Sequence, residues 1–399
     1  MKAQKHNVIV PDALQGLFTV LQQRGYDLIG PTIRDNAVVY GEIRSVDDLP
    51  VGWGDEQDAG AYRPVKRGDA AVFGYNLGPH SWKRFLFPPA MKLFSTTRSP
   101  SGAFVVDGQG NGSGMVGGKA EEHHSKPLAF IGVRACELNA ILVQDKVFTG
   151  NTYTDPQYTD VRNRIFIVAV NCSQSAATCF CSSMSTGPRA DDGFDLCLTE
   201  VLKNDNHYFL IEAGTKLGEE ILTEIPRREA EETEVEEARG IVERVAGSMK
   251  RKMETSDIKK LLQQHLEHPR WDVVANRCLS CANCTMVCPT CFCHTVEDTT
   301  DLAGQHAARW RKWDSCFTTE FSYIHGGSIR TSPRSRYRQW LTHKLANWID
   351  QFGTSGCVGC GRCIAWCPVG IDITEEVSAI RESPADPAVK IPTTITTEV

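Results

Sequence analysis

Residues 278–289 read CLSCANCTMVCP, and residues 357–368 read CVGCGRCIAWCP. Each run separates its first three cysteines by two residues and places a fourth after three more, directly before a proline. This spacing is typical of bacterial ferredoxins, in which cysteine thiolates hold [4Fe–4S] clusters. Two copies of the run therefore predict two clusters and a ferredoxin-like dicluster domain.

The fourth cysteine of such a run usually ligates the other cluster of the pair. The ligands predicted for the first cluster are Cys278, Cys281, Cys284 and Cys367. The ligands predicted for the second cluster are Cys357, Cys360, Cys363 and Cys288. This crossed arrangement would hold the two runs together across the long insert between them.

Zinc and disulfides are the competing uses of so many cysteines. Zinc ribbons place their CxxC pairs far apart, whereas here the four cysteines fall in one compact run. The start, MKAQKHNVIVPDAL, lacks the apolar core of a signal peptide, and no stretch approaches membrane-spanning length. We therefore expect a cytoplasmic protein whose sixteen cysteines serve metal or redox chemistry.

The length and the net charge of the chain limit how many domains it can form and which partners it can bind. The 399 residues suffice for two or three domains, and the formal net charge of −6 gives no indication of nucleic-acid binding. We predict an α+β or α/β protein with an N-terminal mixed α/β domain and a C-terminal α-helical, ferredoxin-like dicluster domain. The predicted bounds are 1–226 for the α/β domain, 227–270 for a helical bridge, 271–382 for the dicluster domain and 383–399 for a flexible tail.

A second group of cysteines follows a predicted βαβ unit. Residues 128–133 and 164–170 have the apolar pattern of strands, and residues 137–146 can form a helix between them. Ligands gather at the carboxyl ends of strands in such folds. The cysteines that follow the two strands, and the proposed ligands of a third cluster, are Cys136, Cys172, Cys179 and Cys181. The alternative is that these are buried core thiols.

Cys291, Cys293 and Cys316 lie between the two ferredoxin runs. They have no repeated ligand spacing, so we favour packing beside the clusters over a labile thiol set or a substitute ligand. Cys197 belongs to an apolar segment and is assigned to the core.

A glycine-rich stretch imitates a nucleotide-binding motif. Gly112, Gly114 and Gly117 match the dinucleotide fingerprint, but the following KAEEHHSKP has no apolar face and reaches Pro127 before a helix could form. We interpret the stretch as a flexible loop. The chain also lacks the paired CxxC motifs of a nickel–iron site, so flavin, nicotinamide and nickel are not expected in it.

The chain resembles the beta, iron–sulfur subunit of soluble cytoplasmic [NiFe] sulfhydrogenases and the related A subunit of anaerobic sulfite reductases. Besides the two cysteine runs, the resemblance rests on GVRACELNAI (132–141), NCSQSAATCFCSSMSTGP (171–188), WDSCF (313–317) and RYRQWLTHK (336–344). It implies an electron-transfer subunit with three cubane clusters. It also implies a partner that binds FAD and NAD(P), and further partners that supply a [NiFe] hydrogenase centre or a sirohaem sulfite reductase.

Two other hypotheses compete with electron transfer. The chain could itself reduce polysulfide or a disulfide, at an exposed cluster or at Cys291, Cys293 and Cys316. Alternatively, the clusters could serve only to stabilise the fold of a binding module.

Overall fold

A computed structural model describes residues 6–106, 126–150, 152–203 and 206–382. The predicted tail at 383–399 and the glycine-rich motif at 112–117 lie outside the described residues. None of the helices within the described ranges has the length and apolar character needed to cross a membrane.

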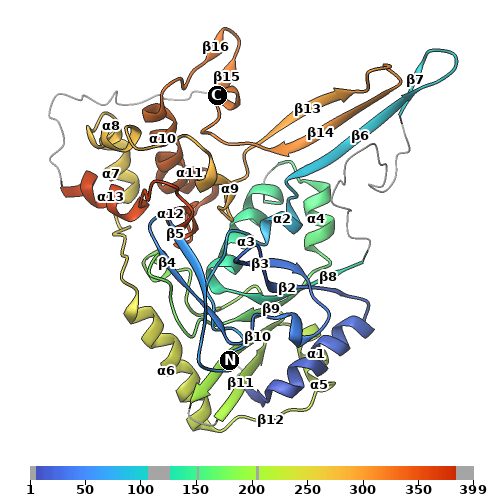
Figure 1. Cartoon of the computed structure of the whole chain (residues 1–399), viewed down its shortest axis with the longest axis vertical. Helices are drawn as coiled ribbons and strands as arrows, with labels where there is room; N and C mark the ends of the chain where they lie inside the picture. Colours follow the sequence, from blue (N-terminus) through green and yellow to red (C-terminus); the bar gives the residue numbers. More distant parts are fainter. Residues whose placement is uncertain (1–5, 107–125, 151, 204–205, 383–399) are drawn as a thin grey trace.

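Eight strands form the main sheet, in the order β12-β1-β11-β10-β9-β8-β2-β3 (Figure 1). Their bounds are β1 (Asn7–Ile9), β2 (Asp27–Arg34), β3 (Ala37–Glu42), β8 (Leu128–Val133), β9 (Phe166–Val170), β10 (Leu196–Lys203), β11 (Asn206–Ala213) and β12 (Arg228–Glu229). Strands β2, β8, β9 and β10 are parallel, and antiparallel strands extend both edges. The protein is thus a mixed α/β structure.

Helices cover both faces of this sheet. On one face pack α1 (Pro11–Gln23) and α5 (Lys216–Thr223), and on the other α3 (Ala135–Phe148) and α4 (Pro156–Arg162). Every residue of β8 and β9 is buried, as expected for parallel strands covered on both sides. The predicted βαβ unit is confirmed as β8, α3 and β9, although β9 begins two residues later than expected.

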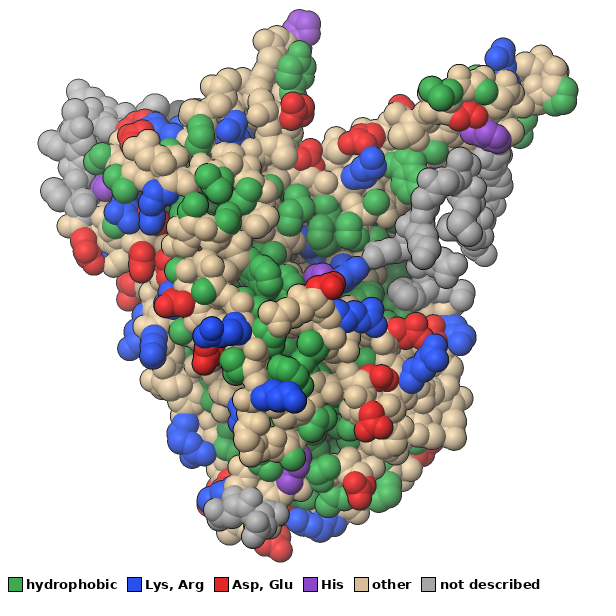
Figure 2. Space-filling view, in the orientation of Figure 1, with side chains coloured by type: hydrophobic (Ala, Val, Ile, Leu, Met, Phe, Trp, Pro, Cys, Tyr) green, Lys and Arg blue, Asp and Glu red, His purple; other side chains and the backbone are tan. Residues whose placement is uncertain are grey.

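A second sheet projects from the body as an arm (Figure 1). Its order is β13-β14-β6-β7, with bounds β6 (Ala90–Arg98), β7 (Phe104–Val106), β13 (His294–Thr300) and β14 (His306–Trp313). The arm therefore joins segments that the sequence assigned to different domains. Hydrophobic side chains show on its surface (Figure 2), and the exposed ones include Leu93, Phe94, Phe104, Val105, Val106 and Val296.

The C-terminal part of the chain is built mostly from short helices. They are α7 (Ile258–Gln264), α8 (Arg270–Ala275), α9 (Asn283–Met286), α10 (Pro333–Thr342), α11 (Trp348–Phe352), α12 (Arg362–Ala365) and α13 (Ile373–Glu382). Their core contains Trp271, Tyr337 and Trp340. The predicted α-helical character holds around the two cysteine runs, but the insert between them also contains β13, β14 and the hairpin of β15 (Tyr323–Ile324) and β16 (Gly327–Ser328). The sequence HTVEDTT of β13 is rich in β-branched residues, which favour strands.

Three further elements connect the two parts of the molecule. They are α2 (Lys83–Leu86), α6 (Glu232–Ser248) and the hairpin of β4 (Trp53–Asp58) and β5 (Ala61–Lys66). The tip of this hairpin touches the second cysteine run, because the Gly60 amide donates to the carbonyl of Ile364 at 3.0 Å. The N-terminal and C-terminal parts are therefore closely packed around the cysteines.

Candidate iron–sulfur centres

The two cysteine runs share one backbone conformation. In each run, the residues directly before and directly after the second cysteine have left-handed dihedral angles. They are Ser280 (φ 51°), Ala282 (φ 67°), Gly359 (φ 63°) and Gly361 (φ 78°). Such values are uncommon for serine and alanine, and strained backbone of this kind gathers at functional sites. The sequence repeat is therefore also a repeat of backbone conformation.

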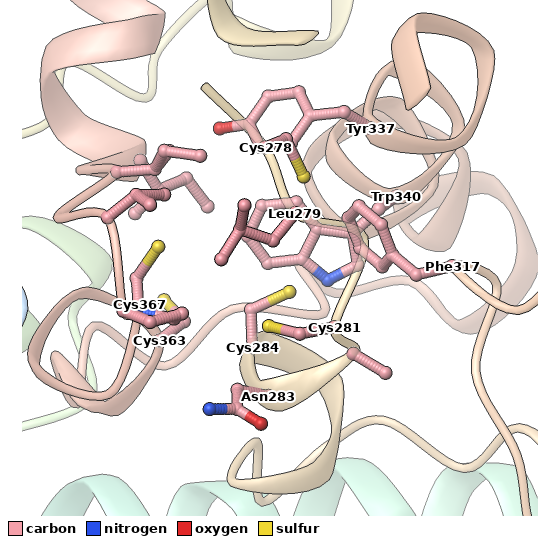
Figure 3. Close-up of a pocket in the computed structure, with 15 residues that line it drawn as sticks. Cys278, Leu279, Cys281, Asn283, Cys284, Phe317, Tyr337, Trp340, Cys363 and Cys367 are labelled. Carbon is pink, nitrogen blue, oxygen red and sulfur yellow. The ribbon is translucent and has the colours of Figure 1, made fainter. Parts of the chain in front are cut away.

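The first predicted ligand set lines a pocket between α9 and α10 (Figure 3). The sulfurs around this space belong to Cys278, Cys281, Cys284 and Cys367, and Cys363 lies beside Cys367. The rest of the wall includes the rings of Phe317, Tyr337 and Trp340. The Ser280 amide donates to the Cys278 sulfur at 3.4 Å. The structure thus brings all four predicted residues to one apolar pocket.

The second predicted ligand set also assembles. Cys357, Cys360 and Cys363 each lie close enough to Cys288 to interact with its charge. The Gly359 amide donates to the Cys357 sulfur at 3.5 Å, which matches the contact in the first run. Burial raises the pKa of Cys357, as a free thiol, to about 12.

The third predicted set gathers at the carboxyl ends of β8 and β9. Cys136 lies in the first turn of α3, Cys172 follows β9, and Cys179 and Cys181 lie in the next loop. The four thiols share a buried cluster with Met249 and Val358. Burial raises the pKa of each of these thiols, that of Cys179 to about 12. Cys197, by contrast, is buried within β10 as the sequence indicated.

The second and third sets are in direct contact. Cys360 of the second set interacts with the thiols of Cys136, Cys179 and Cys181. The Phe180 amide donates to the Gly359 carbonyl at 2.9 Å. Cys363 of the second set also lines the pocket of the first set, so the second set adjoins both of the others.

The lack of a side chain at two glycines permits this contact. A Cβ atom on Gly359 would lie 2.6 Å from the backbone nitrogen and Cα of Cys181, and one on Gly361 would lie 2.5 Å from the carbonyl oxygen of Thr178. Both distances are too short for any larger residue.

Buried cations accompany the thiols. Lys344 lies in a π-helical turn at His343–Asn347 and donates to the Cys288 sulfur at 3.2 Å and to the Gly356 carbonyl at 2.9 Å. A hydrogen bond from Cys291, together with the Lys344 ammonium, holds the pKa of Cys288 well below its usual value. Lys344 lies within the RYRQWLTHK stretch on which the family resemblance rests.

Two buried arginines lie beside the other thiols. The positive charge of Arg134 acts on the thiol of Cys172. The charge of Arg362 acts on the thiol of Cys360, and Arg362 forms an ion pair with Glu137 at 2.5 Å, in which both side chains are almost completely buried. These cations would offset the negative charge of thiolate-bound clusters.

Cys291, Cys293 and Cys316 form a separate thiol group beside the second set. Cys291 is hydrogen-bonded to Cys288, and Cys293 is hydrogen-bonded to Cys316. The bond from Cys316 lowers the pKa of Cys293. The sequence favoured packing beside the clusters for these three cysteines. The structure in addition places their thiols next to one another.

The donor chemistry of the three sets fits iron–sulfur clusters. Each set consists only of cysteine thiols, and backbone N–H groups point at sulfur in the first two. Within the described ranges, no three His, Cys, Asp or Glu side chains surround one point as ligands of a single metal ion. A [4Fe–4S] cluster does not require its ligands to surround one point, because its four thiolates bind separate irons.

Comparisons with known proteins agree with this chemistry. A family model described as a 4Fe-4S dicluster domain matches residues 277–371. The "Sulfhydrogenase 2 subunit beta" of Pyrococcus furiosus is 32% identical over 258 residues, which cover 64% of this chain and 74% of that protein. The chain belongs to the family of sulfhydrogenase beta subunits. No solved structure matches.

Membership of the sulfhydrogenase beta-subunit family confirms the resemblance drawn from the motifs. The dicluster match spans both cysteine runs and ends at Ile371, just before α13. The third cysteine set lies outside that match, so its assignment rests on the geometry described above.

Proposed function

We propose that this chain is the electron-transfer subunit of a multi-subunit oxidoreductase and that it holds three [4Fe–4S] clusters. When bound, each cluster supplies one-electron redox chemistry at a potential that its ligands and surroundings set. Twelve thiols would hold the clusters, in the three sets of the preceding section. The observation that carries the proposal is that the three thiol sets adjoin one another, the second and third through Cys360 and the first and second through Cys363.

The side chains around the thiols suit this role. Tyr337, Trp340 and Phe317 exclude water from one side of the first set. Lys344 and Arg362 place positive charge beside the second set, and Arg134 beside the third. Cys281 is exposed, so the first set reaches the surface of the protein. An electron could enter or leave the subunit there.

The partners follow from the family rather than from the geometry. We propose a partner subunit that binds FAD and NAD(P) on one side and a [NiFe] hydrogenase or a sirohaem sulfite reductase on the other. The relative's name identifies a hydrogenase that acts in sulfur chemistry, which favours the hydrogenase. We also propose a cytoplasmic location, because none of the sixteen cysteines, all of which are described, forms a disulfide.

Iron and acid-labile sulfide per chain, with EPR of the dithionite-reduced protein, test the number of clusters. Three clusters require about twelve irons and interacting signals from three cubanes. About eight irons would contradict the third cluster and leave the ferredoxin pair.

Single-ligand variants test the assignment of each set. Cys281→Ser, Cys360→Ser and Cys172→Ser are each expected to lower the iron content by about four per chain and to remove one EPR signal. Cys197→Ser is the matched control, because Cys197 is buried in β10 away from the three sets. Equal iron content in a ligand variant and in this control would contradict that assignment.

A further inference from the structure

A cavity of about 200 Å³ lies between α6 and the main sheet. Its walls come chiefly from α6, β10, β11 and the chain just after β9, and none of the cysteines lines it. Figure 1 shows α6 beside β11, against which it packs. A single water needs about 10 to 15 Å³. The cavity is therefore large enough for a small organic molecule.

The inner wall of this cavity contains a carboxylate without a donor. Glu212 on β11 is 6% exposed, and its Oε2 atom has no hydrogen-bond partner among the described residues. The Nε2 atom of His6 lies 3.5 Å from Oε2, which is longer than a normal hydrogen bond. A buried acceptor without a donor is costly, and in a native protein it indicates an unseen water, ion or ligand. Glu212 therefore favours a positively charged hydrogen-bond donor in the cavity.

The cavity also reaches the carboxyl end of β9, where Asn171 directly follows the strand. The Asn171 Nδ2 atom donates to the Thr199 hydroxyl at 2.8 Å, and its Oδ1 atom accepts from the Ala190 amide at 2.8 Å. The Thr199 hydroxyl keeps a proton of its own to donate to an occupant. Ligands of α/β folds gather at the carboxyl ends of parallel strands. The cavity therefore lies where a ligand is expected in such a fold.

Two arginines line the solvent side of the cavity. Arg189 and Arg239 are both exposed. Arg189 forms an ion pair with Asp191 at 3.2 Å, whereas none of the described residues forms an ion pair with Arg239. The guanidinium group of an arginine can bind a carboxylate through two parallel hydrogen bonds. The outer end of the cavity therefore favours a negatively charged group.

The remaining wall is aliphatic. It consists of Val235, Ala238 and Val242 from α6 and Leu210 from β11, and the last three of these are buried. Such a wall favours a hydrocarbon group in the ligand, because the removal of apolar surface from water is favourable.

We propose that this cavity binds a small aliphatic amino acid. The ammonium group of the ligand would donate to Glu212, its carboxylate would accept from Arg239, and its hydrocarbon side chain would pack against Ala238 and Val242. A ligand with only one of the two charged groups would leave Glu212 or Arg239 without a partner. The proposal does not depend on the electron-transfer function, because no cluster ligand lines the cavity.

Isothermal titration calorimetry of the anaerobic full-length protein tests the ligand class. Three probes share one carbon skeleton: L-leucine, 4-methylpentanoate, which lacks the ammonium group, and 3-methylbutylamine, which lacks the carboxylate. We expect saturable binding of L-leucine, and binding of each analogue that is weaker by about tenfold or more, because one charged hydrogen bond is lost. If L-leucine gives no saturable heat, or binds no more tightly than either analogue, the proposal is wrong.

Two variants test the residues that bind the charged groups. Glu212→Gln keeps the size of the side chain and removes its charge, so L-leucine should lose most of its advantage over 4-methylpentanoate. Arg239→Gln should likewise remove most of the advantage of L-leucine over 3-methylbutylamine. The matched control is Arg244→Gln, because Arg244 is also exposed on α6 but does not line the cavity. If Arg239→Gln binds L-leucine as tightly as this control, the proposed site is wrong.

Circular dichroism and iron analysis of the same samples separate loss of binding from loss of structure. Arg239 is exposed, so Arg239→Gln is expected to fold even if Glu212→Gln does not, and its result then decides alone. Both variants should keep the iron content of the parent. If the parent binds L-leucine but holds far less than about twelve irons, the result counts against the three clusters alone.

Discussion

At the scale of single residues, Lys344 shows how the surroundings act on the thiols. Its side chain is buried, and the ammonium has three hydrogen-bond acceptors, the Cys288 sulfur, the Thr290 hydroxyl and the Gly356 carbonyl. A π-helical turn places it there, and such turns are frequent at functional sites. Positive charge and hydrogen bonds to sulfur favour the reduced, more negative state of a cluster.

Replacing Lys344 with methionine should lower the reduction potential of the second cluster. A charged hydrogen bond contributes about 1.5 to 3 kcal/mol, which corresponds to about 60 to 130 mV for one electron. EPR-monitored redox titration measures the shift. The control is Lys259→Met, which removes an exposed lysine paired with Asp350. A Lys344→Met protein that keeps its iron and its potential would contradict this role.

At the scale of elements, the two cysteine loops are similar, but their neighbours differ. The first loop uses Ser280 and Ala282 at its left-handed positions, whereas the second uses Gly359 and Gly361. The second loop alone is covered by the loop of the third set, which approaches the glycines too closely for a Cβ atom. The glycines are therefore required by packing as well as by backbone conformation.

Gly359→Ala should separate the second and third sets. The new Cβ would lie 2.6 Å from the backbone of Cys181, so the loop that carries Cys179 and Cys181 must move. We expect the loss of about four of about twelve irons, measured by iron analysis and EPR.

The matched control for this substitution is Gly353→Ala. Gly353 has a similar φ of 68°, but nothing lies within 4 Å of its Cβ position. The only expected effect of Gly353→Ala is a loss of folding stability of about 1 to 2 kcal/mol, because alanine is unfavourable in left-handed backbone. This variant should keep its iron. If the two variants lose iron equally, backbone strain rather than the contact with Cys181 is the cause.

At the scale of the whole molecule, a buried ion pair joins the α/β body to the C-terminal part. Glu137 on α3 accepts hydrogen bonds from Tyr40 at 2.6 Å, Trp82 at 3.1 Å and Arg362 at 2.5 Å. Arg362 also donates to the Gly78 carbonyl. This network lies between the second and third thiol sets, so it fixes their relative position.

Glu137→Ala should destabilise the protein strongly. Removing one partner leaves the Arg362 guanidinium buried without its counter-charge, which typically costs about 3 to 5 kcal/mol. Anaerobic denaturant titration followed by circular dichroism measures the change. Asp298→Ala, which breaks the exposed ion pair with Arg309 on the arm, should leave the unfolding midpoint unchanged. A Glu137→Ala midpoint equal to that of this control would contradict the role of the network.

Removing iron should cause the protein to take up protons. Metal ligands are thiolates, whereas burial raises the pKa of Cys357 and Cys179, as free thiols, to about 12. Once iron is chelated at neutral pH, these groups lie below their pKa and bind protons. In weakly buffered solution the pH should therefore rise as chelation proceeds. The protons that the chelator itself exchanges are measured separately and subtracted from the total uptake. If no proton uptake by the protein remains after this subtraction, the cysteines were already protonated.

The sequence by itself determined the local features of this protein. Ligand spacing in a cysteine run depends on a few covalently linked residues, so both ferredoxin runs could be recognised from the sequence, and their crossed ligation stays a prediction. The buried strands β8 and β9 are continuous apolar runs, and this pattern located Cys136 and Cys172 at neighbouring strand ends.

Only the tertiary structure decided which groups meet across long separations in the chain. The contact of Cys360 with Cys181, the placement of Lys344 beside Cys288, and the pairing of Cys293 with Cys316 all depend on packing between distant segments. The arm likewise pairs β6 with β14, more than two hundred residues later. No periodicity or spacing in one sequence specifies such contacts, because they arise from the close packing of complete elements.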